Sequence, residues 1–176
     1  MAEQIYLPIP DQIGWTNIKT VTLDLFLLHF TYMSSTSTYL NFSRNTEEAF
    51  EFYRSIFGWE FEWKINRFSE MPPSPGYPPL DEWDKDLIMH ISLPILGGHK
   101  LMGTDQAGSM RFDLKPWNNV YICLHPDSLD EANTLFDGLS VGATIEMPLQ
   151  KMFWWDYYWT LKDQFWVQWM INCGTK

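Results

Sequence analysis

The sequence predicts an α+β fold in which two similar βαβββ modules follow one another along the chain. A strand-like segment at residues 37–42 leads into a capped helix, and the same order of elements returns after residue 117. The two predicted helices align when the sequence is shifted by 83 residues, so that Glu47 falls on Asp130. Six matched positions in one helical phase indicate a duplication: Glu47/Asp130, Glu48/Glu131, Ala49/Ala132, Phe52/Leu135, Tyr53/Phe136 and Ile56/Leu139.

The first module opens with "STYLNF" (37–42), which alternates as a half-buried strand does. Asn45 is a helix-capping residue, Glu47 and Glu48 bring acids to the first turn, and Gly58 ends the helix. Its apolar face holds Ala49, Tyr53, Ile56 and Phe57. Three more strands are predicted at 60–68, 86–95 and 99–104, with a proline-rich loop at 71–79.

The second module repeats this order. A strand at 118–124 precedes a helix that Asp127 or Ser128 caps and that ends at Gly142. The helix buries Leu129, Ala132, Leu135, Phe136 and Leu139. Strands are then predicted at 143–149, 157–161 and 166–172.

Residues 1–32 differ in pattern from the rest and are interpreted as an N-terminal extension ahead of a domain at 33–176, with modules at about 37–105 and 117–173. Met33 is a plausible natural start. Two interpretations stay open: upstream sequence read through, or a real arm that adds a strand.

Composition excludes several classes of partner. The net charge of −10 argues against nucleic acid, which requires clustered lysine and arginine. The longest apolar block, 23–30, has about half the length of a membrane span and lacks the basic start and small-residue cleavage site of a signal peptide. We therefore expect a soluble, cytoplasmic protein. Cys123 and Cys173 lie in apolar strand-like segments and are interpreted as two buried thiols.

The doubled pattern resembles the vicinal oxygen chelate superfamily of glyoxalase I, extradiol dioxygenases and bleomycin-binding proteins. "YLNFSRNTEEAFEFYRSIFG", "DKDLIMHISLPI", "LMGTD", "NNVYICLHPDSLDEANTLFDGLS" and "FWVQWMIN", in this order over about 37–173, resemble its PhnB-like branch. The resemblance implies two curled modules that pair their edges into one open, mixed sheet around a cavity, with the helices outside. It also implies a homodimer. A methyltransferase reading has no support, because no glycine-rich loop follows the first strand.

In metal-using members of the superfamily, four inward-facing strand positions carry His and Glu. The resemblance places Ser37 (or Thr38), Met102, Asn119 and Met170 at these positions. None is a good ligand for zinc, nickel or iron. We therefore expect no metal and no other cofactor.

Strand alternation predicts which side chains face the cavity. His90 is a weak candidate for an acid or base, although a hydrogen-bonded structural histidine is the plainer interpretation. No Cys–His or Ser–His–Asp arrangement follows from spacing alone. Each wall residue is equally consistent with a pocket or with core: Tyr39, Asn41, His90, Asn119, Tyr121, Trp154, Asp156, Tyr158, Gln168 and Met170.

Five of the ten tryptophans lie within residues 152–173. "FGWEF", "PWNN", "FWWDYYWT" and "DQFWVQW" resemble family stretches that carry glycine at Trp59, Trp117, Trp155, Trp159 and Trp166. Glycine at turns permits positive φ, which a large side chain reaches only with strain. One hypothesis is that UGA codons were translated with the wrong table and the native chain has glycine there. The other is an aromatic-lined cup.

The sequence thus predicts a metal-independent protein that binds a small molecule of unknown identity in a central cup. One alternative is a divalent-metal-dependent enzyme of the glyoxalase or dioxygenase kind with displaced ligands. A second alternative is a structural or regulatory dimer. Whether any catalysis occurs is left open.

Overall fold

A computed structural model describes residues 34–72, 76, 79–108, 114–116 and 118–174 of the chain. The predicted extension at residues 1–32 and Trp117 lie outside this part. From Thr36 onward the chain forms one compact unit. No helix among the described residues has the length and apolar character of a membrane span.

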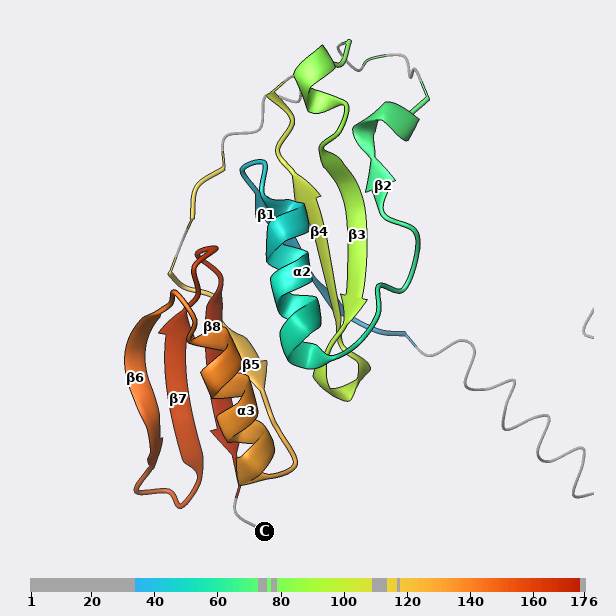
Figure 1. Cartoon of the computed structure of the whole chain (residues 1–176). Helices are drawn as coiled ribbons and strands as arrows, with labels where there is room; N and C mark the ends of the chain where they lie inside the picture. Colours follow the sequence, from blue (N-terminus) through green and yellow to red (C-terminus); the bar gives the residue numbers. More distant parts are fainter. Residues whose placement is uncertain (1–33, 73–75, 77–78, 109–113, 117, 175–176) are drawn as a thin grey trace, which may run out of the picture. The chain divides into compact units, whose positions relative to one another are not determined.

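The first module forms a four-stranded mixed sheet in the order β1-β4-β3-β2, with helix α2 over one face (Figure 1). Strand β1 is parallel to β4, and the other neighbours are antiparallel. Short 3-10 helices η2 (Phe68–Glu70), η3 (Glu82–Asp84) and η4 (Leu96–Gly98) lie in the connections. The main elements are β1 (Ser37–Phe42), α2 (Thr46–Phe57), β2 (Asn66–Arg67), β3 (Ile88–Pro94) and β4 (Lys100–Asp105).

The second module repeats the arrangement, with the order β5-β8-β7-β6 and helix α3 over one face (Figure 1). Strand β5 is parallel to β8, as β1 is to β4. Its elements are β5 (Ile122–Leu124), α3 (Leu129–Leu139), β6 (Thr144–Lys151), β7 (Tyr157–Lys162) and β8 (Gln168–Cys173).

The predicted fold class is confirmed: an α+β protein of two βαβββ modules whose mixed sheets stay open. One detail differs from what the resemblance implied, because the strands form two separate four-stranded sheets. Among the described residues, β1 pairs with β4 alone and β5 with β8 alone. Each sheet therefore ends in two edge strands with a single described partner, β1 and β2 in the first sheet and β5 and β6 in the second.

Two predicted strands are shorter in the structure than in the prediction. Of residues 60–68 only Asn66–Arg67 pair in a sheet, and of residues 118–124 only Ile122–Leu124 do. Glu62 instead donates its backbone N–H to the Ser92 carbonyl at 2.9 Å, and its carboxylate accepts from the Ser92 hydroxyl at 3.2 Å. Alternating apolar residues predicted a strand at 60–68, but these contacts with Ser92 accompany a bend at residues 62–63.

The N-terminus of α2 is capped by a residue that is distant in sequence. Asn45 is the residue before α2, yet its side chain makes no capping hydrogen bond. Asp105 of β4 takes that role, because its carboxylate accepts from the backbone N–H of Thr46 at 3.0 Å and from the Thr46 hydroxyl at 2.7 Å. The predicted cap at Asn45 is therefore wrong, since a carboxylate brought by the sheet satisfies the helix end instead.

The ends of the two helices are closed by local sequence. At α3, the hydroxyl of Ser128 accepts from the backbone N–H of Glu131 at 3.1 Å, which decides between the two predicted caps. Gly58 ends α2 with φ of 72° and donates its N–H to the Arg54 carbonyl. Helix α3 ends at Leu139, before Gly142, which has φ of 68° in the following turn.

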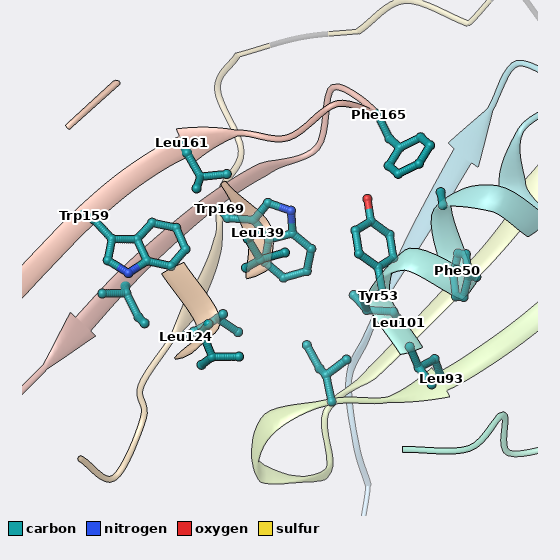
Figure 2. Close-up of a cluster of buried hydrophobic side chains, with 14 of the residues drawn as sticks. Phe50, Tyr53, Leu93, Leu101, Leu124, Leu139, Trp159, Leu161, Phe165 and Trp169 are labelled. Carbon is teal, nitrogen blue, oxygen red and sulfur yellow. The ribbon is translucent and has the colours of Figure 1, made fainter. Parts of the chain in front are cut away.

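Each helix packs on its sheet through small residues. Ala49 and Ala132, at matching positions of α2 and α3, are fully buried. On β4, a side chain at Gly103 would collide with the ring of Phe50, so glycine permits the close approach of α2. The fully buried core includes Leu93, Leu101, Leu139, Leu161 and Ile171, several of which are drawn in Figure 2.

Asp163 joins the two modules. Its carboxylate, 4% exposed, lies in the β7–β8 turn and accepts from the hydroxyl of Tyr53 in α2 at 2.7 Å. The indole N–H of Trp169 donates to the same carboxylate at 2.8 Å, and the backbone N–H groups of Phe165 and Val167 donate at 2.8 and 3.0 Å. Figure 2 shows Tyr53, Phe165 and Trp169 together in this region. Four donors thus compensate a buried carboxylate.

Only part of the strain expected at the tryptophans is present. Trp155 and Trp166 have φ of 80° and 70°, which glycine adopts readily. Trp59 and Trp159 do not have positive φ, so the strain expected at glycine-like positions does not arise at these two. Trp159 is instead fully buried in β7, and within the described residues its indole N–H has no hydrogen-bond partner. The backbone therefore favours glycine at two turns, and Trp159 carries a different defect.

Replacing Tyr53 by phenylalanine removes one donor to a buried charge. We expect the free energy of unfolding to fall by about 1.5 to 3 kcal/mol, measured by urea denaturation. The matched control is Tyr158→Phe, which removes a hydroxyl outside this cluster and should cost less than about 0.5 kcal/mol. Equal effects from the two variants would contradict the role given to Asp163.

Replacing Trp166 by glycine should relieve its positive φ. The expected gain is up to about 1 kcal/mol, because relief of strain exceeds the loss of the Lys162 contact, 4.3 Å from the Trp166 ring. Trp59→Gly is the control, since Trp59 lacks positive φ and should only lose stability. Denaturation measures both variants. Mass spectrometry of the native protein tests the hypothesis itself, and tryptophan at 155 and 166 would refute it.

Candidate functional site

The face of the first sheet that is turned away from α2 carries polar and aromatic side chains. Tyr39 lies opposite Met102, and Asn41 lies opposite Thr104, so these four share one face of the β1–β4 ladder. Leu101 and Gly103, which alternate with them on β4, are buried beneath α2. Tyr39 remains 48% exposed, so this face is open to solvent in the chain described here.

Tyr39 and His90 form the centre of this first open face. Their rings stack with centroids 5.9 Å apart and planes 30° apart, and the Tyr39 hydroxyl lies 3.4 Å from Nδ1 of His90. Partial burial raises the pKa of Tyr39, opposed by a hydrogen bond with Thr104. The phenol therefore stays protonated at neutral pH and can donate a hydrogen bond to a ligand.

The corresponding face of the second sheet is lined by a second polar and aromatic group. Cys123, Met170 and Thr160 lie side by side across β5, β8 and β7. The Tyr121 hydroxyl donates to the carboxylate of Glu146 at 2.7 Å. This hydrogen bond, followed by burial, raises the pKa of Tyr121 to about 12.

Asn172 links the remaining predicted residues on this second open face. Its amide donates to the Asp156 carboxylate at 2.8 Å and accepts from the indole N–H of Trp154 at 3.4 Å. Trp154 meets Tyr158 edge to face with ring centroids 5.9 Å apart. Burial raises the pKa of Tyr158, with the nearby Cys123 and Glu146 adding to the effect.

The predicted wall residues therefore fall into three sets. Three of them, Tyr39, Asn41 and His90, share the face of the first sheet. Five belong to the second sheet and the turn beside it: Tyr121, Trp154, Asp156, Tyr158 and Met170. The other two, Asn119 and Gln168, are placed differently.

Asn119 is exposed and lies before β5, outside the strand that alternation had assumed. Gln168 is only 5% exposed and its amide donates to the Val120 carbonyl at 2.9 Å, which holds the start of β5 against β8. Asn41 and Gln168 also line a cavity of about 500 Å³ with Leu40, Phe42 and Ile122.

The four positions to which the resemblance assigns metal ligands carry Ser37, Met102, Asn119 and Met170 here. They offer a hydroxyl, an amide and two thioethers. The Ser37 hydroxyl lies 3.5 Å from the sulfur of Met102, and Met170 lies opposite Cys123. Among the described residues, no three His, Cys, Asp or Glu side chains come together as metal ligands. A hydroxyl and thioethers do not make a site for zinc, nickel or iron.

Sequence reasoning missed several polar residues on the second sheet. Glu146 and Asn172 were not singled out, and Cys123 was expected to be buried, whereas the structure exposes it. Cys173 is buried as expected. The expectation for Cys123 fails because β5 is an edge strand, where apolar neighbours in sequence do not imply cover. The Cys-x-His spacing of Cys123 and His125 was the available signal, since residues two apart in extended chain share a face, although β5 itself ends at Leu124.

Two βαβββ modules with open, polar sheet faces define the vicinal oxygen chelate class. The chain is 31% identical to protein PA1353 from Pseudomonas aeruginosa, with a TM-score of 0.69. The match covers 82% of this chain and all of PA1353. A PhnB protein from Bacillus cereus is 23% identical over 80% of this chain and all of its own length, with a TM-score of 0.60.

A glyoxylase/bleomycin resistance protein/dioxygenase domain from Frankia sp. EAN1pec shares the fold at 13% identity, covering 82% of this chain and 95% of that domain, with a TM-score of 0.54. No family model matches the chain, and no curated protein does. The chain belongs to the PhnB-like branch of the vicinal oxygen chelate superfamily.

The Tyr121–Glu146 pair makes a pH-dependent prediction. The pKa of Tyr121 is raised to about 12 in the folded chain. The hydrogen bond therefore stabilises the folded state fully at pH values below the unfolded pKa of about 10. It is lost as pH rises from about 10 through about 12. Glu146→Gln should lower the pKa of Tyr121 toward about 10, seen by ultraviolet titration of the tyrosines.

Tyr121→Phe is the control for this titration, because it removes the ionising group while leaving Glu146 in place. The component near pH 12 should disappear in this variant. A titration that is the same in wild type, Glu146→Gln and Tyr121→Phe would show that the pair does not form.

Proposed function

We propose that the protein binds a small molecule on its open sheet faces, without a divalent metal, and acts as a homodimer. The observation that carries the proposal is the contrast between the two faces of each sheet. One face is packed under a helix with leucine, isoleucine and aromatic core. The other presents tyrosine, histidine, methionine and asparagine that stay partly accessible, including Tyr39, His90, Tyr158, Met170 and Asn172.

The chemistry of these side chains suits a ligand with apolar surface and a few polar groups. Aromatic rings and methionine sulfur provide contact area, while the hydroxyl of Tyr39 and the amide of Asn41 can exchange hydrogen bonds. The net charge of −10 disfavours a strongly anionic ligand. The proposed ligand is therefore a neutral or cationic small molecule, and catalysis is not part of the proposal.

Metal independence is supported by the donors at the four usual positions. Divalent zinc, nickel and iron prefer imidazole, carboxylate and thiolate ligands, whereas Ser37, Met102 and Met170 offer a hydroxyl and thioethers. His90 is one imidazole on the first open face, and a single imidazole does not make a divalent-metal site. Binding through hydrogen bonds and packing fits these residues better.

A second copy is proposed because each sheet is open and its edge strands have a described partner on one side only. Strands β1 and β5 have one described partner each, which leaves backbone N–H and C=O groups without a strand on the other side. Pairing of such edges between two chains would bring an open face from each chain together. The space between the two open faces would then be enclosed by both copies.

Binding is tested by thermal shift with a library of neutral aromatic and phenolic compounds. A ligand that binds the folded state must raise the melting temperature, and Tyr39→Ala or Tyr158→Ala should abolish the shift. Trp59→Ala is the control, since Trp59 is an exposed aromatic outside both faces. Loss of the shift in this control as well would contradict a site on the open faces.

Metal content and mass in solution test the other two parts of the proposal. We expect less than about 0.1 divalent ion per chain by elemental analysis, and a mass of two chains by light scattering. Stoichiometric zinc, nickel or iron would favour a metal-dependent enzyme instead. A monomer would leave each open face without the second copy and would refute the dimer.

A further inference from the structure

A cysteine and a histidine lie in contact at the edge of the second sheet. Cys123 of β5 and His125, two residues later, are separated by 3.5 Å between Sγ and Nε2. Both side chains are on the exposed surface of the described chain. This distance is within hydrogen-bonding range for a thiol and an imidazole, so the proton of the thiol can pass to Nε2.

The other nitrogen of His125 fixes the direction of this hydrogen bond. Nδ1 lies 3.2 Å from the backbone carbonyl of Asn172. Because a carbonyl oxygen only accepts, Nδ1 must carry the hydrogen, and Nε2 is then free to accept from the thiol of Cys123. Asn172 is in turn held by Asp156 and Trp154. The arrangement is a nucleophile, a base and a group that orients the base.

A cavity of about 420 Å³ opens beside this pair, and both Cys123 and His125 line it. The opposite wall is the turn between β3 and β4, with Ile95 and Leu96. His99 lines the cavity too, but its Nε2 is engaged by the Thr38 hydroxyl at 2.9 Å. A small molecule with an apolar chain can therefore reach the sulfur.

The thiol itself is not activated by its surroundings. Partial burial raises the pKa of Cys123, so the thiolate is scarce at neutral pH. Reaction through this sulfur therefore requires a proton acceptor during the attack, and His125 is the imidazole in contact with it. The other cysteine, Cys173, is 1% exposed, and its thiol lies 3.9 Å from the Gly174 carbonyl. Cys173 therefore serves as an internal control, a buried thiol against which the reactivity of Cys123 is compared.

We propose that Cys123 is a nucleophile, assisted by His125, that adds to small α,β-unsaturated carbonyl compounds. The sulfur forms a bond to the β-carbon while the thiol proton moves to Nε2 of His125. The carbon–carbon π electrons move to the carbonyl as an enolate, and the proton from His125 then reaches the α-carbon. All atoms are retained, and neither an oxidant nor a leaving group is needed.

Sulfur is a soft nucleophile, which matches the polarised double bond of such compounds. The apolar wall of Ile95 and Leu96 suits a short hydrocarbon chain. This site lies beside the second open face, where Cys123 is opposite Met170, and it does not involve Tyr39, Asn41 and His90 of the first face. Adduct formation at the sulfur does not require the proposed ligand to be bound. It assigns a chemical role to an exposed thiol that the binding proposal leaves unused.

The test uses acrylamide, a small neutral α,β-unsaturated amide, on the full-length protein. Intact mass and peptide mapping should place one adduct on Cys123 while Cys173 stays unmodified in the folded chain. His125→Gln should slow the reaction at neutral pH by about 10-fold or more. His99→Gln is the matched control and should change the rate by less than about twofold, because that imidazole contacts Thr38 and not the thiol.

A second measurement does not depend on any variant. Proton transfer to His125 during the attack should give a normal solvent deuterium isotope effect in the wild-type protein, since a proton is in flight in the transition state. Reaction of Cys173 as fast as Cys123, an unchanged rate in folded His125→Gln, or the absence of a normal isotope effect would each overturn the proposal. Cys123→Ser should abolish the adduct, and an adduct that persists would equally overturn it.

Discussion

The buried carboxylate of Asp163 is the constraint on which the arrangement of the two modules depends. Asp163 is only 4% exposed, so its charge must be compensated by hydrogen bonds. Tyr53 of the first module donates one of them. Desolvation raises the pKa of Asp163, while four hydrogen bonds oppose that rise. The same burial, together with Asp163, raises the pKa of Tyr53 well above its ordinary value. Tyr53 is the one of these four donors that comes from the first module, so this hydrogen bond joins the two modules.

With the modules joined through this buried cluster, the sheets keep one face each for other purposes. Helices α2 and α3 cover one face of each sheet, so the alternating side chains on the other face are not packed under these helices. This explains why polar and aromatic residues such as Tyr39, His90 and Tyr158 stay partly accessible.

The backbone angles and burial of the tryptophans bear on the two interpretations of their abundance, which are glycine positions and an aromatic-lined cup. Trp155 and Trp166 are exposed, adopt positive φ and have Lys151 and Lys162 over their rings. Trp159 is enclosed by core and packs on Phe136 with ring centroids 5.6 Å apart. Of these three, none lies among the wall residues predicted for the cup. Abundance of tryptophan is therefore a poor guide to a binding surface in this chain.

The sequence by itself determined the order of elements, the duplication and the side of each strand on which a residue lies. These properties depend on local periodicity, turn residues and caps, as at Gly58 and Ser128. Tertiary structure decided what each side chain meets: Asp105 in place of Asn45 at the end of α2, Glu146 for Tyr121, and His125 for Cys123. It also decided that the strands form two sheets. Periodicity fixes the direction of a side chain, whereas its partner comes from segments that only folding brings together.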